Sequence, residues 1–226
     1  MKTFFKYIVL AAAITAFAGM ARATPTLMLW TADTGFLTIN DNGVGDTANT
    51  VNGAISFTGS LGHFTFNVVA AVSYPVTGTL ESPVLDISFL TVSDATGGML
   101  KILFSDNGFG PTAGVNATAD LSGTTPGSVS YKAFGGATNT QFDASHLLCA
   151  GPFTGSFAAD IVGAAINNGG PYSLTSVITI TQSGAGKVSS GDIMLSVPDG
   201  GTTALLVGLG LLVMSAFARR RKVTKA

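Results

Sequence analysis

The side chains that most often carry out catalysis are scarce in this chain. It has two histidines, His63 and His146, and a single cysteine, Cys149. A cysteine and a histidine far apart in sequence can meet in a fold and form a nucleophilic pair. A cysteine in an apolar run such as Leu147-Leu148-Cys149 is, however, more typical of a small buried side chain. We favour the buried thiol.

Other catalytic patterns do not occur. Glu81 is the only glutamate between the two ends of the chain, and most aspartates fall in predicted turns, so a pair of carboxylates for glycoside hydrolysis cannot be named. The sequence has no nucleophile elbow, zinc-protease motif or phosphate-binding loop. It predicts a protein that is not an enzyme, with no catalytic residue.

One loop has the residue types of a calcium site. Asp41-Asn42-Gly43-Val44-Gly45-Asp46 places two carboxylates and an amide within six residues, and calcium prefers several oxygen ligands from a flexible loop. The acidic residue that would complete an EF-hand is missing. Aspartate and asparagine beside glycine are also typical of tight turns, which is the interpretation we favour. Asp41 and Asp46 are the candidate ligands, and no other cofactor is predicted.

Four aromatic residues could bind sugar rings if they were exposed in a row: Trp30, Tyr74, Tyr131 and Tyr172. Aromatic side chains of this kind more often pack in the core of a β protein. Core packing is the interpretation that we favour for any single one of them.

The segment from residue 24 to 196 has the pattern of an all-β domain. Apolar residues alternate with polar ones, as in Leu85-Asp86-Ile87-Ser88-Phe89, and this period is that of a strand with one buried face. Turn residues such as Asp41-Asn42-Gly43, Asp106-Asn107-Gly108 and Thr125-Pro126-Gly127 separate the runs. We predict one β-sandwich, with a jelly roll as one form it could take, and strands at 55–58, 63–68, 85–89, 99–104, 115–121, 129–134, 156–162, 172–181 and 192–196.

Charge restricts the partners of this domain. Only 10% of the 226 residues are charged, against roughly 25% in ordinary soluble domains. Residues 24–196 carry 11 acidic side chains and three lysines, a net charge of −8. This excess predicts no nucleic-acid partner and argues against anionic polymers in general.

The N-terminus has the pattern of a secretory signal peptide over residues 1–23. Lys2 and Lys6 precede an uncharged apolar run from residue 8 to 18, and Ala21-Arg22-Ala23 fits the cleavage pattern of signal peptidase. Cleavage after Ala23 would leave Thr24 as the first residue of the mature protein.

The C-terminus has the pattern of a membrane anchor. Residues 202–218 carry no charge, and as a helix they would reach roughly 25 Å, enough to cross a thin bilayer. The basic cluster Arg219-Arg220-Arg221-Lys222 begins the tail over 219–226. Such a cluster stays in the cytoplasm, so the signal peptide and the anchor predict the same orientation, with the β domain outside.

The segment before this anchor, Val197-Pro198-Asp199-Gly200-Gly201, together with the apolar stretch and the basic cluster, resembles a PEP-CTERM protein-sorting signal. The resemblance covers residues 197–226 only. In that family an exosortase, a membrane-embedded cysteine transpeptidase-like enzyme, reads the three parts together. The usual motif is Val-Pro-Glu-Pro, whereas this chain has Asp199 and Gly200 at the last two positions. Pro198 and the two glycines favour an extended, flexible backbone beside the bilayer.

These observations predict an exported bacterial protein of the cell surface or extracellular matrix. Its expected partners are the secretion machinery, signal peptidase, the membrane before processing, and an exosortase. The body is predicted to be structural or adhesive. Because the family is associated with extracellular polysaccharide, the alternative is a carbohydrate-binding module of the exopolysaccharide matrix, in one form calcium-dependent. A secreted hydrolase is the least favoured class.

Overall fold

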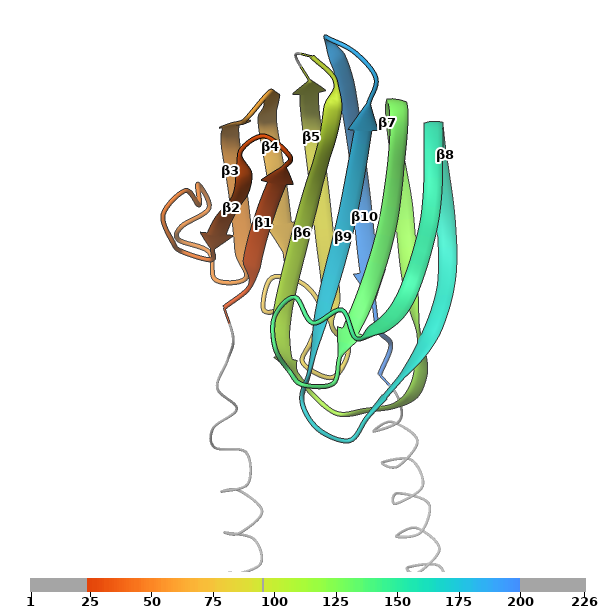
Figure 1. The fold of residues 1–226 in the computed structure, drawn as a ribbon. Coiled ribbons are helices and arrows are strands. Elements are labelled where there is room, and N and C mark those ends of the chain that lie inside the picture. Colours follow the sequence, from red (N-terminus) through yellow and green to blue (C-terminus); the bar gives the residue numbers. More distant parts are fainter. Residues whose placement is uncertain (1–23, 95, 200–226) are drawn as a thin grey trace, which may run out of the picture.

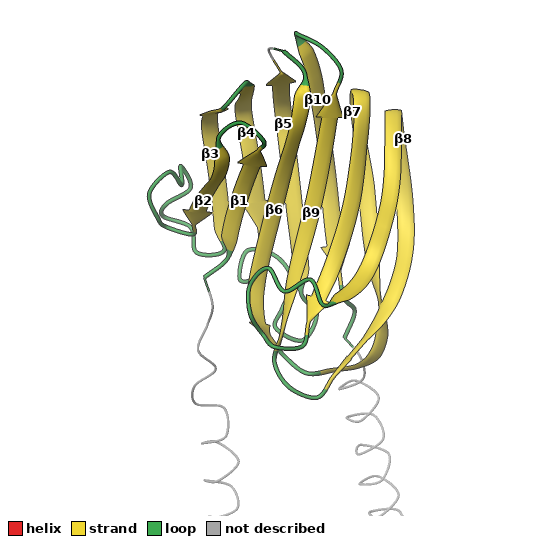
Figure 2. Cartoon of the chain, in the orientation of Figure 1, coloured by secondary structure: helices red, strands yellow, loops and turns green. Residues whose placement is uncertain are grey.

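The computed structural model of the chain describes residues 24–94 and 96–199, and within them it contains ten strands and no helix (Figure 2). The all-β prediction is confirmed. The predicted signal peptide, membrane segment and basic tail lie outside the described residues. The described residues hold no helix that could span a membrane. The strands are β1 (Thr26–Thr31), β2 (Gly35–Asn40), β3 (Ala54–Leu61), β4 (Phe64–Val72), β5 (Val84–Asp94), β6 (Gly98–Phe109), β7 (Thr112–Gly136), β8 (His146–Asn168), β9 (Tyr172–Gln182) and β10 (Lys187–Ser196).

All strand pairs are antiparallel and belong to one continuous sheet that curls on itself (Figure 1). The strand order is β2-β1-β6-β9-β7-β10-β5-β4-β3, with β8 paired to β7. We call β2, β1, β6, β9 and residues 128–136 of β7 the β6–β9 half. The β5–β10 half consists of residues 118–124 of β7 and of β10, β5, β4 and β3, with residues 156–162 of β8 at its edge. The two halves face each other, an arrangement consistent with the predicted β-sandwich.

Alternation along the strands fills the space between the halves. On β5, Leu85, Ile87 and Phe89 are fully buried, while Asp86 and Ser88 lie on the outer face. Leu100, Ile102 and Phe104 of β6 do the same from the opposite half. The period-two pattern therefore predicts correctly which side chains build the core.

A single bent strand joins the two halves. β7 has 25 residues and would reach roughly 80 Å if it were straight. Instead its residues 118–124 pair with β10 and its residues 128–136 pair with β9, and the register shifts between Thr125 and Ser128. β8 follows the same bend on the outer side, pairing Gly155 with Thr125 and Thr154 with Ser128.

The predicted turn at Thr125-Pro126-Gly127 is therefore wrong. Proline and glycine do bend the chain here, but strand pairing continues across the bend because β8 is paired on both sides of it. The strands predicted at 115–121 and 129–134 are one strand. The turn predicted at Asp106-Asn107-Gly108 is likewise an irregularity inside β6, between two segments paired with β9. No strand is predicted over β1 or β2, both of which are present in the structure.

The corner of β7 leaves no room for a side chain at Gly127. A Cβ atom there would lie 2.0 Å from the carbonyl oxygen of Thr181 on β9. We expect Gly127→Ala to lower the free energy of unfolding by about 1–3 kcal/mol, because the corner must shift to admit the methyl group. Urea denaturation followed by circular dichroism measures this.

Gly184→Ala is the matched control. No atom lies within 4 Å of the added Cβ at Gly184, and its φ is outside the left-handed region. Equal stability of the two variants would show that the close approach at the corner has no energetic weight.

Candidate functional site

Two of the four aromatic residues offered for sugar stacking are in the core. Tyr131 and Tyr172 are 0% and 1% exposed. The Tyr131 hydroxyl lies 3.2 Å from Ser176 Oγ, and the Tyr172 ring packs against Phe109 with centroids 5.8 Å apart. Burial raises the pKa of both hydroxyls, which stay neutral. The interpretation as core packing is correct for these two, because both side chains point inward.

Trp30 has a different position, on the outer face of the β6–β9 half. It is paired in register with Phe36 of β2 on one side and with Lys101 of β6 on the other. The Trp30 and Phe36 ring centroids are 6.2 Å apart at 47°, and Lys101 Nζ lies 4.8 Å from the Trp30 ring centroid. Phe36 is 64% exposed. We call these three residues the aromatic–lysine row.

Phe36 and Lys101 were not singled out in the sequence. Nothing local marks either residue, since they are 65 positions apart and meet Trp30 only through strand pairing. The alternation within β2 could have identified Phe36, because it places this large apolar side chain on the exposed side of the strand and Ile39 on the buried side.

A second cation lies on the same face. The second cation is Lys132 of β7, which lies in the row next to that of Trp30 and Lys101. Register pairs form this row by connecting Met28 to Leu103, Leu103 to Val177 and Val177 to Lys132. Lys101 and Lys132 are the only ionisable side chains that the described strands of the β6–β9 half point outward. Asp106 of β6 is buried, where its carboxylate accepts a hydrogen bond from Ser73 Oγ at 2.8 Å.

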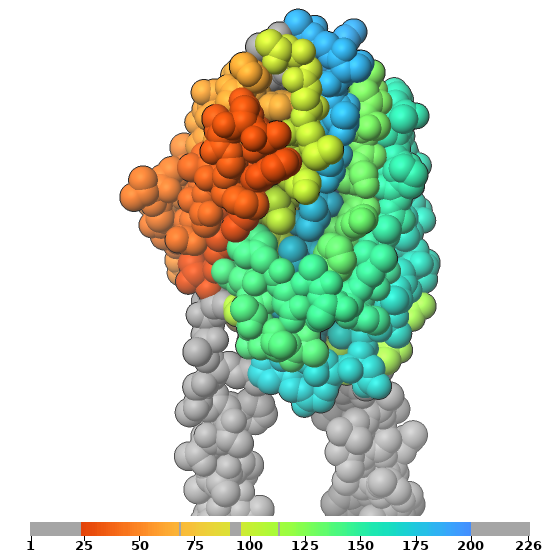
Figure 3. All heavy atoms as spheres, in the orientation of Figure 1, coloured from red at the N-terminus to blue at the C-terminus, as the bar shows by residue number. Residues whose placement is uncertain are grey.

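The loop after β7, residues 137–145, covers the lower end of this face in Figure 3. It is tied to β6 by the Phe142 N–H, which donates to Ser105 Oγ at 2.9 Å, and by Asn139 Oδ1, which accepts from the Gly108 N–H at 2.7 Å. The Asp143 carboxylate accepts from Thr138 Oγ1 and from the Ser145 N–H. These hydrogen bonds lower the pKa of Asp143.

The outer face of the β5–β10 half carries the opposite charge. Register pairs place Asp86, Met194, Asp120 and Asp160 in one row across β5, β10, β7 and β8. Asp192 stands in the adjacent row, where its carboxylate accepts from Ser88 Oγ. Burial, and then the charge of Asp192, raises the pKa of Asp86 to about 6. The outer faces of the two halves therefore carry charges of opposite sign.

The predicted calcium loop has the hydrogen bonds of a turn. The Asp46 carboxylate accepts from the N–H groups of Asn42, Ala48 and Ser56 at 2.8–3.0 Å. The Asp41 carboxylate accepts from the Gly53 N–H at 2.8 Å. In the described range, no three His, Cys, Asp or Glu side chains are grouped so that they could hold a metal ion. A calcium site at Asp41 and Asp46 remains a prediction.

Asp41 also borders a polar cavity of about 330 Å³. The half-buried Tyr74 is on its wall, so the fourth predicted aromatic residue faces this cavity and not the aromatic–lysine row. The other lining residues come from the start of the described chain and from the loop after β2: Thr24, Pro25, Asn42, Asn52 and Gly53.

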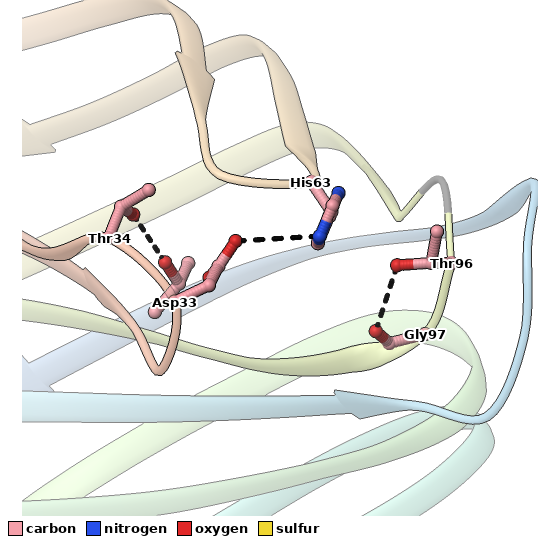
Figure 4. A network of polar contacts seen from close by, with 6 residues as sticks. Asp33, Thr34, His63, Thr96 and Gly97 are labelled. Carbon is pink, nitrogen blue, oxygen red and sulfur yellow. Dashed lines mark hydrogen bonds and ion pairs between the residues drawn. The ribbon is translucent and has the colours of Figure 1, made fainter.

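The candidate nucleophile is not activated. Cys149 is 2% exposed, and burial raises the pKa of its thiol, the opposite of what a reactive thiolate requires. His63 faces Asp33, with Nε2 3.6 Å from Oδ2, between the β3–β4 and β1–β2 turns (Figure 4). Both side chains are exposed, so this contact contributes little to stability. His146 Nε2 lies 3.2 Å from the Ala165 carbonyl oxygen.

The predicted sorting motif begins where the folded domain ends. Val197 is fully buried; its N–H donates to the Pro83 carbonyl at 3.0 Å, and its own carbonyl accepts from Ser82 Oγ at 3.2 Å. Pro198 and Asp199 are exposed. The other predicted targeting residues lie outside the described range: Ala21, Ala23, Gly200, Gly201, Arg219, Arg220, Arg221 and Lys222.

No protein-family model and no curated protein matches the chain. TmCBM61 in complex with β-1,4-galactotriose is 11% identical over 55% of this chain and 85% of that chain, with a TM-score of 0.31. The K1 cleaved adhesin domain of Lys-gingipain from Porphyromonas gingivalis W83 is 9% identical over 77% and 91%, with a TM-score of 0.35. The CBM36-1 domain of a xylanase from the hindgut metagenome of Trinervitermes trinervoides is 11% identical over 51% and 79%, with a TM-score of 0.29. Scores this low leave the function to be argued from the chain's own residues.

The Asp86–Asp192 pair predicts a pH-dependent stability. The pKa of Asp86 is about 6 in the folded state and about 3.9 in an unfolded chain. Between these values the folded state holds a proton that the unfolded state releases, so the free energy of unfolding falls as pH rises through this window. Because Asp86 is only half-buried, we expect a loss of about 1 kcal/mol. Asp86→Asn should remove that loss in urea titrations at pH 4 and pH 7.

Asp160→Asn is the control, because it removes a carboxylate from the same row without touching the Asp86–Asp192 pair. If Asp86→Asn kept the full pH dependence of the wild type, the pair would not be its source.

Proposed function

We propose that this chain is an exported, non-catalytic protein of the bacterial cell surface or extracellular matrix, processed by an exosortase, whose β domain binds polysaccharide. The proposal joins the predicted adhesive role to its carbohydrate-binding alternative. The observation that carries the binding part is the exposed aromatic–lysine row on a broad sheet face.

The position of the sorting motif supports processing at the domain's edge. Val197 is held by Ser82 and Pro83, so the extended substrate that a membrane enzyme needs begins at Pro198. β1 begins and β10 ends at the same end of the sheet (Figure 1). A single membrane surface facing that end would serve both predicted targeting elements.

The chemistry of sugar rings supports binding at the aromatic–lysine row. A pyranose ring presents C–H groups on its faces, and an exposed aromatic ring buries them without losing hydrogen bonds from the sugar hydroxyls to water. Phe36 offers such a ring, and its contact with Trp30 holds it in place. Thr38 and Thr179 lie beside the row on the same face, with hydroxyls available to sugar.

We expect Phe36→Ala to weaken binding of polysaccharide about tenfold, a loss of about 1.4 kcal/mol. Affinity electrophoresis through gels containing soluble bacterial exopolysaccharide measures the change. Leu90→Ala is the control, because Leu90 is 65% exposed on β5 of the other half. Equal retardation of the two variants and the wild type would count against the site.

For the sorting signal, we expect the mature protein to end near residue 200 and to leave the inner membrane in its native host. The double variant Pro198→Ala, Asp199→Ala should keep its basic tail, because the motif is no longer recognised. Intact mass and cell fractionation distinguish the two. A wild type that retains the tail and stays in the membrane would be a simply anchored protein, contrary to the proposal.

A further inference from the structure

Lys101 and Lys132 are unusual cations for this chain. The domain has only three lysines against 11 acidic side chains. Even so, the only ion pair between described side chains joins His63 to Asp33, so neither lysine is paired with a carboxylate. Lys101 is instead held over the Trp30 ring at 4.8 Å, an arrangement that fixes an ammonium group without neutralising it.

The arrangement places a stacking ring beside a fixed cation. Phe36 and Lys101 lie on either side of Trp30 in the sheet register, so their Cα atoms are roughly 10 Å apart by the ordinary spacing of strands. Lys132 lies two strands further across, one row along the same face. A polymer lying across the strands would meet an aromatic ring and then two ammonium groups.

The acidic net charge does not cancel this local field. The carboxylates of Asp86, Asp120, Asp160 and Asp192 project from the other half, whose sheet stands about 10 Å behind this one, and they point away from it. Their distance from the lysines therefore exceeds the Debye length of about 8 Å at physiological ionic strength. The flanking turns carry two further carboxylates, Asp33 beside His63 and Asp143 within its own loop; both stay charged, and neither lies within ion-pair distance of Lys101 or Lys132.

From this geometry we infer that the aromatic–lysine row, together with Lys132, selects acidic polysaccharide, whose sugar rings bear carboxylates. The inference rests on the proposed polysaccharide binding and names its substrate class. A polyuronate has both parts that this surface recognises, since one of its rings can cover Phe36 while carboxylates of residues further along the polymer meet Lys101 and Lys132. The net negative charge of the domain argues against binding of an acidic polymer. Because the carboxylates and the two lysines lie on opposite faces, however, the lysine face can still attract one.

The test compares polygalacturonate with its methyl ester, which has the same backbone without the charge. We expect the mature protein, which begins at Thr24 and ends near residue 200, to bind polygalacturonate at least tenfold more tightly than the ester in isothermal titration at 50 mM NaCl. The preference should shrink at 500 mM NaCl, because salt screens exposed charges. The double variant Lys101→Gln, Lys132→Gln should lose the preference, whereas Lys187→Gln on β10 should keep it.

The outcomes separate the inference from the function on which it rests. Equal affinity for polygalacturonate and ester, unchanged in the lysine double variant, would overturn the acidic specificity and leave polysaccharide binding intact. Binding to neither polymer, nor to the exopolysaccharide of the host, would overturn both. If the lysine changes altered the sedimentation coefficient of the protein alone, the face would be a contact between copies of this chain, and the inference would be wrong. Urea denaturation confirms that each variant is folded.

Discussion

The bend in β7 holds the two halves of the sheet face to face. Residues 118–124 of β7 pair with β10 on one side of the core, and residues 128–136 pair with β9 on the other side. Backbone hydrogen bonds of a single strand therefore position both halves. The corner requires a residue without a side chain, because Gly127 stands against the carbonyl of Thr181. β8 repeats the bend outside β7, and its two legs contact each other through the stacked rings of Phe153 and Phe157, 4.9 Å apart. Together these two strands close one side of the core.

Once the halves face each other, the inward positions are mostly apolar, and the buried Asp106 carboxylate accepts a hydrogen bond from Ser73 Oγ. The exposed charges of the strands lie on the two outer faces. Strand register then decides which charges become neighbours. It aligns carboxylates from β5, β7 and β8 on one face, where Asp86 and Asp192 face each other. It aligns Phe36, Trp30 and Lys101 on the opposite face. A domain with a strong negative average thereby acquires one face whose only outward ionisable strand residues, among those described, are lysines.

The aromatic–lysine row and the proposed sorting motif differ in how the fold holds them. The row lies on three paired strands, where each ring and the ammonium group have a register partner. The proposed motif would need an extended segment outside the sheet. Val197 is buried against Ser82 and Pro83, whereas Pro198 and Asp199 are exposed. The boundary between fixed and accessible backbone falls inside the motif.

The fold class and most of the core can be predicted from the sequence, because period-two alternation is local and is present in each strand on its own. The targeting signals stay a prediction from contiguous residues at the two ends of the chain. That Pro126-Gly127 is a corner and not a turn depends on β8, whose residues paired on either side of the corner lie 26 and 30 positions further along the chain. Only the tertiary structure buried Tyr131 and Tyr172 and brought Phe36 to Trp30 and Lys101. Contacts between strands distant in sequence are set by register, and register depends on how the whole sheet closes around its core.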